Sequence, residues 1–280
     1  MSFKIYLETS FKTSELITKQ YSTSFSWATF FLEKDKRKAI YAIYGFVRLA
    51  DEIVDTFHEY DKLFLLNELR QDLYYALNNK ISINPVLMSF ADTAIKYDIK
   101  KEQIESFLKS MESDLTKSNY YYQEELNEYV YGSADVVGLM CLKVFCNGNT
   151  GLYKELELPA RKLGSAFQKV NFLRDLKNDI NELNRNYFPE IINGVFDVVT
   201  KEKIEAVIDS EFREAYEGLK RLPGKSKLAV ALAYFYYMAL FKKIKKATPE
   251  MVLSKRFRIS NFRKSLIMFK VFLMYKLKII

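Results

Sequence analysis

The chain is poor in the residues that build redox, nucleotide and multi-histidine metal centres. Its 280 residues include one histidine and two cysteines. The single histidine, His58, excludes sites with several histidine ligands and has no nucleophile motif beside it, so we expect it to be solvated. Cys141 and Cys146 are separated by five positions in an apolar stretch, which predicts free core thiols in a reducing, cytoplasmic compartment. No GxGxxG motif and no P-loop occurs.

Proline and glycine are also scarce, with 5 and 9 copies in the whole chain. Because these residues break helices, their scarcity predicts long helices with few interruptions. No alternation of period two, no internal repeat and no linker is present. We therefore expect one all-α domain over residues 1–280. Helical patterns occupy residues 1–20, 36–58, 61–79, 85–97, 101–115, 123–147, 157–183, 201–221, 225–246 and 259–278.

Long hydrophobic runs are absent, and no apolar run reaches 18 residues, so we expect no transmembrane helix. The N-terminus carries Glu8 and Glu15 and does not resemble a signal peptide. Residues 251–280 hold eight Lys or Arg and no acid, which accounts for the whole net charge of +8. This basic, apolar segment suits an anionic membrane surface, and a packed terminal helix with solvated lysines is the alternative. It contains no nucleic-acid module, so no nucleic-acid partner is expected.

Two aspartate pairs carry most of the functional information. Asp51 and Asp55, and likewise Asp175 and Asp179, have i,i+4 spacing, which places both carboxylates on one face of a helix. Like charges at this spacing cost a helix roughly 0.2–0.5 kcal/mol. Two such pairs among apolar residues indicate divalent cations that offset the repulsion. Two amphipathic helices with acidic solvated faces are the simpler alternative.

Each pair continues a polar stripe along an otherwise apolar helix. Tyr44 and Arg48 precede the first pair, and Gln168, Asn171 and Arg174 precede the second. Carboxylates without histidine or thiolate ligands favour Mg²⁺ or Mn²⁺, which commonly bridge protein carboxylates to phosphates. Arginines bind the remaining phosphate charge in bidentate fashion. Such a clamp beside an apolar cavity predicts a substrate with a diphosphate head and a hydrocarbon tail.

The sequence resembles the squalene/phytoene synthases of the all-α isoprenoid synthase fold, a helical bundle with a central apolar cavity. The resemblance covers nearly the whole chain and is greatest to bacterial phytoene synthases. It rests on five motifs in order: residues 21–25 (YSTSF), 43–55 (IYGFVRLADEIVD), 129–138 (YVYGSADVVG), 168–175 (QKVNFLRD) and 185–189 (RNYFP).

The resemblance implies head-to-head condensation of two geranylgeranyl diphosphates to phytoene, through a cyclopropyl diphosphate and without NADPH. It implies metal binding by the four aspartates and Asn171, and places Tyr129 and Gln168 beside the reacting carbons. It implies diphosphate contacts from Ser22, Ser24, Tyr44, Arg48, Arg174, Arg185, Tyr237 and Arg256.

Three positions depart from the family pattern. Asn178 replaces an acid, Asn184 replaces a glycine, and Asp135 replaces a small residue, which affects the expected fine metal geometry. A squalene or hydroxysqualene synthase acting on farnesyl diphosphate remains an alternative, because the residues at the tunnel end cannot be located. A silent assembly or scaffold relative and a lipid-binding helical protein are further alternatives. The oligomeric state is left open.

Overall fold

The structure is a computed structural model that describes residues 3–182, 185–192 and 195–280. In this part of the chain there is no strand, only one isolated bridge between Asn119 and Asn186, so the predicted all-α class is confirmed. The helices are α1 (Phe3–Tyr21), α2 (Thr23–Thr29), α3 (Lys34–Asp55), α4 (Lys62–Asn79), α5 (Pro85–Lys96), α6 (Lys101–Thr116), α7 (Gln123–Val130), the π-helical turn η1 (Tyr131–Asp135), α8 (Val136–Cys146), α9 (Thr150–Asn181), α10 (Pro189–Ile192), α11 (Val198–Leu219), α12 (Gly224–Lys245), α13 (Pro249–Ser254) and α14 (Asn261–Lys276).

Polar side chains begin seven of these helices, and each accepts a hydrogen bond from a backbone N–H that the first turn leaves unpaired. Ser22 accepts from the Phe25 N–H at the start of α2. Asp61, Asn84, Asn149, Asp197, Thr248 and Ser260 cap later helices in the same way. Nine of the ten helical patterns lie within a few residues of their observed bounds.

The exception is the pattern over residues 157–183: its predicted start at residue 157 is wrong. The helix α9 begins at Thr150, capped by Asn149, and contains Pro159. The proline obscured the helical pattern in the sequence, yet the helix continues through it. The short helices α10 and α13 were not predicted.

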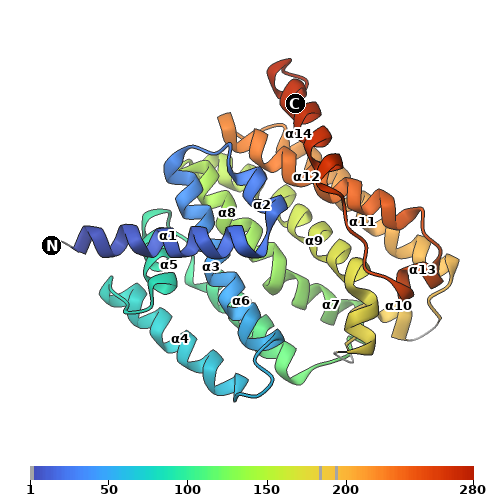
Figure 1. Cartoon of the computed structure of the whole chain (residues 1–280), viewed down its shortest axis with the longest axis horizontal. Helices are drawn as coiled ribbons and strands as arrows, with labels where there is room; N and C mark the ends of the chain where they lie inside the picture. Colours follow the sequence, from blue (N-terminus) through green and yellow to red (C-terminus); the bar gives the residue numbers. More distant parts are fainter. Residues whose placement is uncertain (1–2, 183–184, 193–194) are drawn as a thin grey trace.

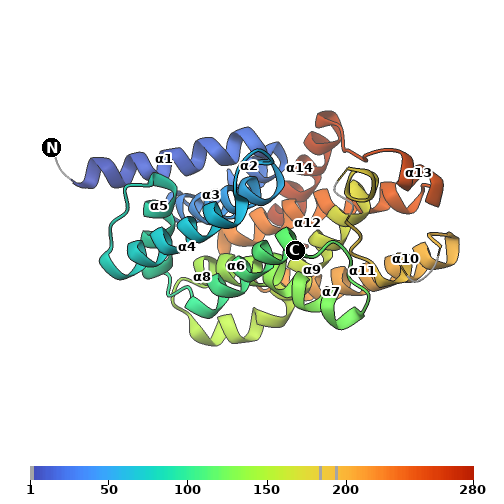
Figure 2. The ribbon, with the colours of Figure 1, turned by 90° about the horizontal axis from the view of Figure 1, so that it is seen from below.

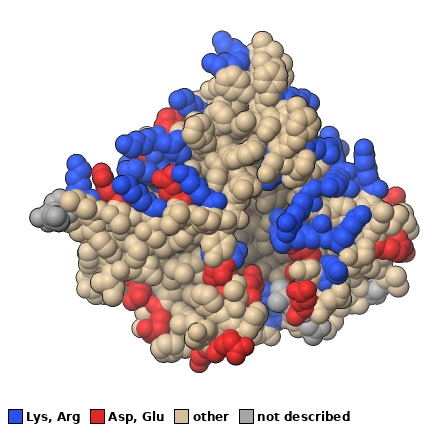
Figure 3. All heavy atoms as spheres, viewed as in Figure 1, with Lys and Arg blue, Asp and Glu red and all other residues tan. Residues whose placement is uncertain are grey.

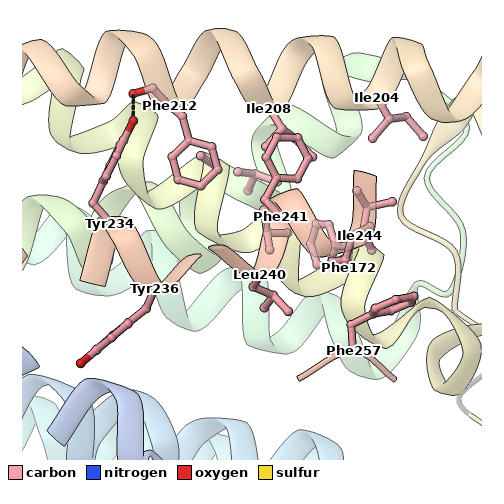
Figure 4. Packing of buried hydrophobic residues seen from close by; sticks show 14 of the residues in the cluster. Phe172, Ile204, Ile208, Phe212, Tyr234, Tyr236, Leu240, Phe241, Ile244 and Phe257 are labelled. Atoms are coloured by element: carbon pink, nitrogen blue, oxygen red, sulfur yellow. Dashed lines mark hydrogen bonds between the residues drawn. The ribbon is translucent and has the colours of Figure 1, made fainter. Parts of the chain in front are cut away.

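Two hydrophobic clusters form the interior. One gathers the N-terminal helices α3 to α6 with α8, and the other gathers α9, α11 and α12. The two groups lie on opposite sides of the molecule, with α9 and α12 contributing to both (Figures 1 and 2). Figure 4 shows the second cluster, where Phe212 of α11 meets Phe241 of α12 and the Tyr234 hydroxyl donates to the Phe212 carbonyl. The single-domain organisation stays a prediction.

Gly132 and Gly138 lie where their helices approach neighbouring helices closely. A Cβ on Gly132 would lie 2.5 Å from the Ser106 carbonyl oxygen, and one on Gly138 would lie 2.9 Å from the Ala160 carbonyl oxygen. The π-helical turn η1 falls at the first of them. By length and hydropathy, Gln123–Cys146 could cross a membrane, but 61% of the tested window is buried inside the protein. These close contacts make the segment a core helix.

The free thiols and the solvated histidine that the sequence predicted are confirmed, while the compartment stays a prediction. Cys141 and Cys146 are free thiols, and burial raises the pKa of Cys146 to about 11. His58 is exposed, and its Nδ1 lies 3.0 Å from the Lys62 Nζ.

Candidate active site

The acidic stripes of α3 and α9 meet at one place in the fold, beside a hollow in the face shown in Figure 3. Arg185, in the connection after α9, links them: its Nη1 donates to Asp55 Oδ1 at 3.0 Å. The negative charges of Asp175 and Asp55 both raise the pKa of the Asp179 carboxyl. The two acidic stripes therefore meet at one site instead of forming two separate solvated faces.

In the α3 pair, the two carboxylates have different surroundings. Asp55 is half-exposed and accepts from Arg185. No hydrogen bond or ion pair to the Asp51 side chain occurs among the described residues. Burial, together with the negative charge of Asp55, raises the pKa of Asp51 from 3.8 to about 7.

The α9 pair repeats this pattern in the opposite order. Asp175 is bound by two arginines, Arg174 at 3.0 Å and Arg256 at 2.7 Å. Asp179 has no side-chain partner in the part of the chain that the structure describes. Burial and the charge of Asp175 raise the pKa of Asp179 to about 7.

A fifth acid, Asp114 of α6, joins the site and was missed by the sequence reasoning. The Tyr129 hydroxyl donates to Asp114 Oδ2 at 2.8 Å, and Arg185 Nη2 donates to the Asp114 carbonyl oxygen at 2.8 Å. The other carboxylate oxygen, Oδ1, is buried without a partner. Burial raises the pKa of Asp114 to about 7 against the opposing charge of Arg185. An acid on the apolar stripe of its helix, beside Met111, was the signal available in the sequence.

Aromatic rings line the wall beside these acids. Tyr129, from the end of α7, stacks on Tyr187 with centroids 5.2 Å apart, and Tyr187 stacks on Phe172 at 4.0 Å. Tyr120 completes the group. Burial raises the pKa of Tyr129 and of Tyr187 well above 10, so both hydroxyls stay protonated.

Two further tyrosines, one from α12 and one from α3 itself, lie beside the acid pairs. The Tyr237 hydroxyl of α12 donates to Asn171 Oδ1 at 3.2 Å, and its ring stacks on Phe167 at 3.9 Å. Tyr44 of α3 stacks on Phe25 of α2 at 5.0 Å. Burial raises the pKa of Tyr44 to about 12, with Arg48 and the Ser22 hydroxyl acting against this rise.

Several predicted site residues make no bond to the acid pairs among the described residues, and Arg48, Ser24 and Gln168 are three of them. Arg48 pairs with Glu52 and lies over the Tyr21 ring, 4.4 Å from its centroid. Ser24 and Gln168 are half-buried, in α2 and α9, and no bond joins either to the acids. Asp135 forms an ion pair with Arg161, and Asn178 is half-buried in α9. Asn184 lies outside the described residues.

The donors fit a divalent metal of the hard, oxygen-preferring kind. In residues 3–182, 185–192 and 195–280, no three His, Cys, Asp or Glu side chains form a ready-made metal cluster. Magnesium does not require one, since it binds through one or two carboxylates with waters and substrate phosphates. The unpaired carboxyls of Asp51 and Asp179, with raised pKa values, are where a cation would offset the repulsion.

Comparison with known proteins agrees with this geometry. Residues 18–263 match the family model described as squalene/phytoene synthase. The 4,4'-diapophytoene synthase of Staphylococcus haemolyticus is 24% identical over 92% of this chain and 94% of its own length. The phytoene synthase of Arthrospira platensis is 29% identical over 73% of this chain and 69% of its own length.

Solved structures show the same fold. A dehydrosqualene synthase in complex with a ligand superimposes with a TM-score of 0.81 at 24% identity, covering 98% of this chain and 99% of its own. The squalene synthase HpnC from Alicyclobacillus acidocaldarius has a TM-score of 0.75 at 19% identity, covering 86% and 95%. Family members use a divalent metal to bind prenyl diphosphates. The chain therefore belongs to the squalene/phytoene synthase family of prenyltransferases, which condense prenyl diphosphates head to head.

Proposed function

We propose that this protein condenses two molecules of geranylgeranyl diphosphate to phytoene, with Mg²⁺ or Mn²⁺ and without NADPH. The observation that carries the proposal is the meeting of both acid pairs, their arginines and an aromatic wall at one site. The choice of a C20 substrate rests on the motif resemblance and on the relative named phytoene synthase.

The acid pairs and arginines would bind the diphosphate heads. Magnesium, when bound to Asp51, Asp55, Asn171, Asp175 and Asp179, supplies positive charge to the departing diphosphate. Arg174, Arg185 and Arg256 already occupy carboxylates of the site, and they would turn toward phosphate oxygens when substrate binds. Ser22, Ser24, Tyr44, Arg48 and Tyr237 would hold the rest of the diphosphate surface.

The aromatic wall would hold the hydrocarbon part. The ring faces of Tyr129, Phe172 and Tyr187 attract a carbocation electrostatically and exclude water that would quench it. The Asp114 carboxylate accepts a hydrogen bond from the Tyr129 hydroxyl, and this bond fixes the Tyr129 ring in the wall. Gln168 lies on the same helix as Phe172, one turn away, and would lie beside the reacting carbons.

A second candidate is the same condensation with farnesyl diphosphate. It is favoured by the relative named 4,4'-diapophytoene synthase, which the chain matches over nearly its whole length. A reductive squalene synthase would differ from both by requiring NADPH.

One assay separates these functions. Purified protein is incubated with geranylgeranyl or farnesyl diphosphate, with and without NADPH, and the products are identified by mass spectrometry. Phytoene formed without NADPH supports the proposal. A C30 product from farnesyl diphosphate alone supports the second candidate, and squalene formed only with NADPH overturns both. No diphosphate release from either substrate would point to a silent scaffold.

A cytoplasmic location with peripheral attachment to the inner face of the membrane is also part of the proposal. The surface that would make this attachment is argued next.

A further inference from the structure

The C-terminal helix α14 has two apolar faces, of which only one is used by the fold. Val271 is fully buried, and Ile267, Met268, Met274 and Tyr275 pack beside it against the second hydrophobic cluster. This inner face lies against α12. A helix that needs one face for packing normally carries polar residues on the other.

The outer face of α14 is apolar as well. Phe262 is 74% exposed, Phe269 is 64% exposed and Leu277 is 68% exposed. Leu266 and Leu273 lie between them, and the spacing of 4, 3, 4 and 4 residues places all five on one side of the helix. We call these five residues the outer stripe. Large exposed apolar patches commonly mark interaction sites.

The surroundings of the outer stripe are strongly basic. Residues 251–280 contain no acid at all. In Figure 3 a band of uncharged residues runs down from the top of the molecule, with Lys and Arg side chains on both sides of it.

Two cavities lie at the two ends of α14, and both are lined by cations. The first, about 470 Å³, lies at the N-terminal end and is lined by Lys243, Arg258, Ile259, Ser260, Asn261 and Arg263. The second, about 590 Å³, lies at the C-terminal end and is lined by Lys220, Lys227, Tyr275, Lys276, Lys278, Ile279 and Ile280. Neither includes an acid, so both suit anionic groups such as phosphates.

We propose that α14 is a docking helix for an anionic phospholipid surface: the outer stripe enters the interface and the two cavities receive lipid phosphates. An apolar face between basic residues is the pattern of helices that lie in the plane of a membrane. A second copy of this chain is a poorer occupant, because two outer stripes in contact would bring their basic margins together. An anionic bilayer satisfies both the apolar face and the charge.

Docking would also place the site close to the bilayer. The Lys264 Nζ lies 3.1 Å from the Thr23 hydroxyl of α2, and Phe272 packs against Phe31 just after that helix. Because Ser22 caps α2 and Tyr237 belongs to α12, the docking helix lies against two elements of the site. A hydrocarbon product would then leave toward lipid, a consequence that rests on the proposed function.

Binding to vesicles tests the docking surface without substrate, so its failure is separate from failure of the proposed function. The full chain is sedimented with phosphatidylcholine vesicles that contain or lack phosphatidylserine, at low and high salt. We expect binding that requires phosphatidylserine and weakens with salt. Equal binding to both vesicle types, or none, would overturn the proposal.

Two variants and matched controls locate the surface. Phe262→Ser with Phe269→Ser removes part of the outer stripe, and Lys270→Gln with Lys276→Gln and Lys278→Gln removes charge. The first variant should weaken vesicle binding at least tenfold, because it removes apolar surface that enters the interface. The second should do the same, because every basic residue near an anionic surface adds severalfold to affinity. The controls Ile83→Ser with Val195→Ser, and Lys109→Gln with Lys154→Gln and Lys203→Gln, change equally exposed residues elsewhere and should bind as the parent does. Controls that weaken binding as much as the α14 variants would refute the assignment.

A fluorescent probe reports whether the stripe enters the lipid. The parent has one tryptophan, Trp27. In Phe269→Trp, vesicles should shift emission to shorter wavelength, and brominated lipids should quench it more than in the parent. Unchanged emission of the added tryptophan, or a dimer in solution that Phe269→Ser dissociates, would show that lipid is not the occupant.

Discussion

The acid pairs of α3 and α9 have the same spacing but opposite internal order. In α3 the second carboxylate, Asp55, is bound by Arg185, and the first, Asp51, is unpaired. In α9 the first carboxylate, Asp175, is bound by two arginines, and the second, Asp179, is unpaired. Each pair therefore contains one carboxylate held by an arginine and one with a pKa of about 7.

This comparison shows how the fold tolerates four aspartates at one site. Arginines neutralise one member of each pair, and the other member carries the unfavourable charge. Charged groups without partners at a partly buried site are costly to stability and are typical of functional sites. The unpaired members are therefore the positions where a metal would contribute most.

The largest expected effect comes from replacing the unpaired acids. Asp51→Asn and Asp179→Asn should each lower kcat/KM at least about 100-fold, since a metal contact supplies several kcal/mol of transition-state stabilisation. Turnover and circular dichroism are measured for each variant. Near-normal turnover in either variant would refute its role in metal binding.

The same two variants should become more stable as they lose activity. The folded-state pKa of Asp51 is about 7 against 3.8 for the ordinary group, so the folded protein holds this proton more tightly than the unfolded chain does. Ionisation thus lowers stability as pH rises from about 4 to 7, and the full penalty applies above pH 7. At pH 8 and without metal, the Tm of Asp51→Asn should exceed that of the parent, and a lower Tm would contradict the comparison.

The arginines should differ in their contribution to stability. Arg185 is buried and bonds both Asp55 and the Asp114 carbonyl, so Arg185→Gln should cost about 1–3 kcal/mol of unfolding free energy. Arg256 is exposed, and Arg256→Gln should cost less than about 1 kcal/mol while raising KM. Urea unfolding and steady-state kinetics measure both. Equal losses of unfolding free energy in the two variants would show that the two arginines stabilise their acid pairs equally.

Metal should act on stability in a pH-dependent way. Because burial raises the pKa values of Asp51, Asp114 and Asp179 to about 7, the metal-free protein should lose Tm on the order of 5 °C between pH 6 and pH 8. Mg²⁺ should restore more of the Tm at pH 8 than at pH 6, where the carboxyls are largely protonated. The Asp51→Asn, Asp179→Asn double variant is the control, and a pH dependence equal to the parent's would exclude these acids as its source.

Most of the fold could be predicted because helices leave periodic patterns in sequence. The boundary of α9 could not, since Asn149 and Pro159 act oppositely there and only packing decides that the helix continues through the proline. Both acidic stripes could be predicted from the sequence, but only the fold brings them together, since solvated acidic faces were the alternative. Their internal order was not, because Arg256 reaches Asp175 from a segment far away in sequence.

Asp114 shows the remaining limit. In sequence it is one acid among several in α6, and only the fold brings Tyr129 and Arg185 to it. Arg48 pairs with Glu52 one turn further along α3, and the diphosphate contact that the motif implied for it stays a prediction. Local patterns predict which face of a helix is polar, whereas the partners of each charge depend on distant segments.

The smallest expected effect extends the comparison to the tyrosine beside each pair. The Tyr237 hydroxyl donates to Asn171 in the stripe of α9, and its ring is held separately by Phe167. Tyr237→Phe removes one hydrogen bond and keeps the stack, so kcat/KM should fall about 2- to 10-fold, as a bond of about 0.5–1.5 kcal/mol predicts. Tyr44→Phe, whose ring is held by Phe25, is the matched variant in the stripe of α3. If Tyr237 serves only the packing of α12, Tyr237→Phe will leave kcat/KM unchanged and Tyr237→Ala will lower only the Tm.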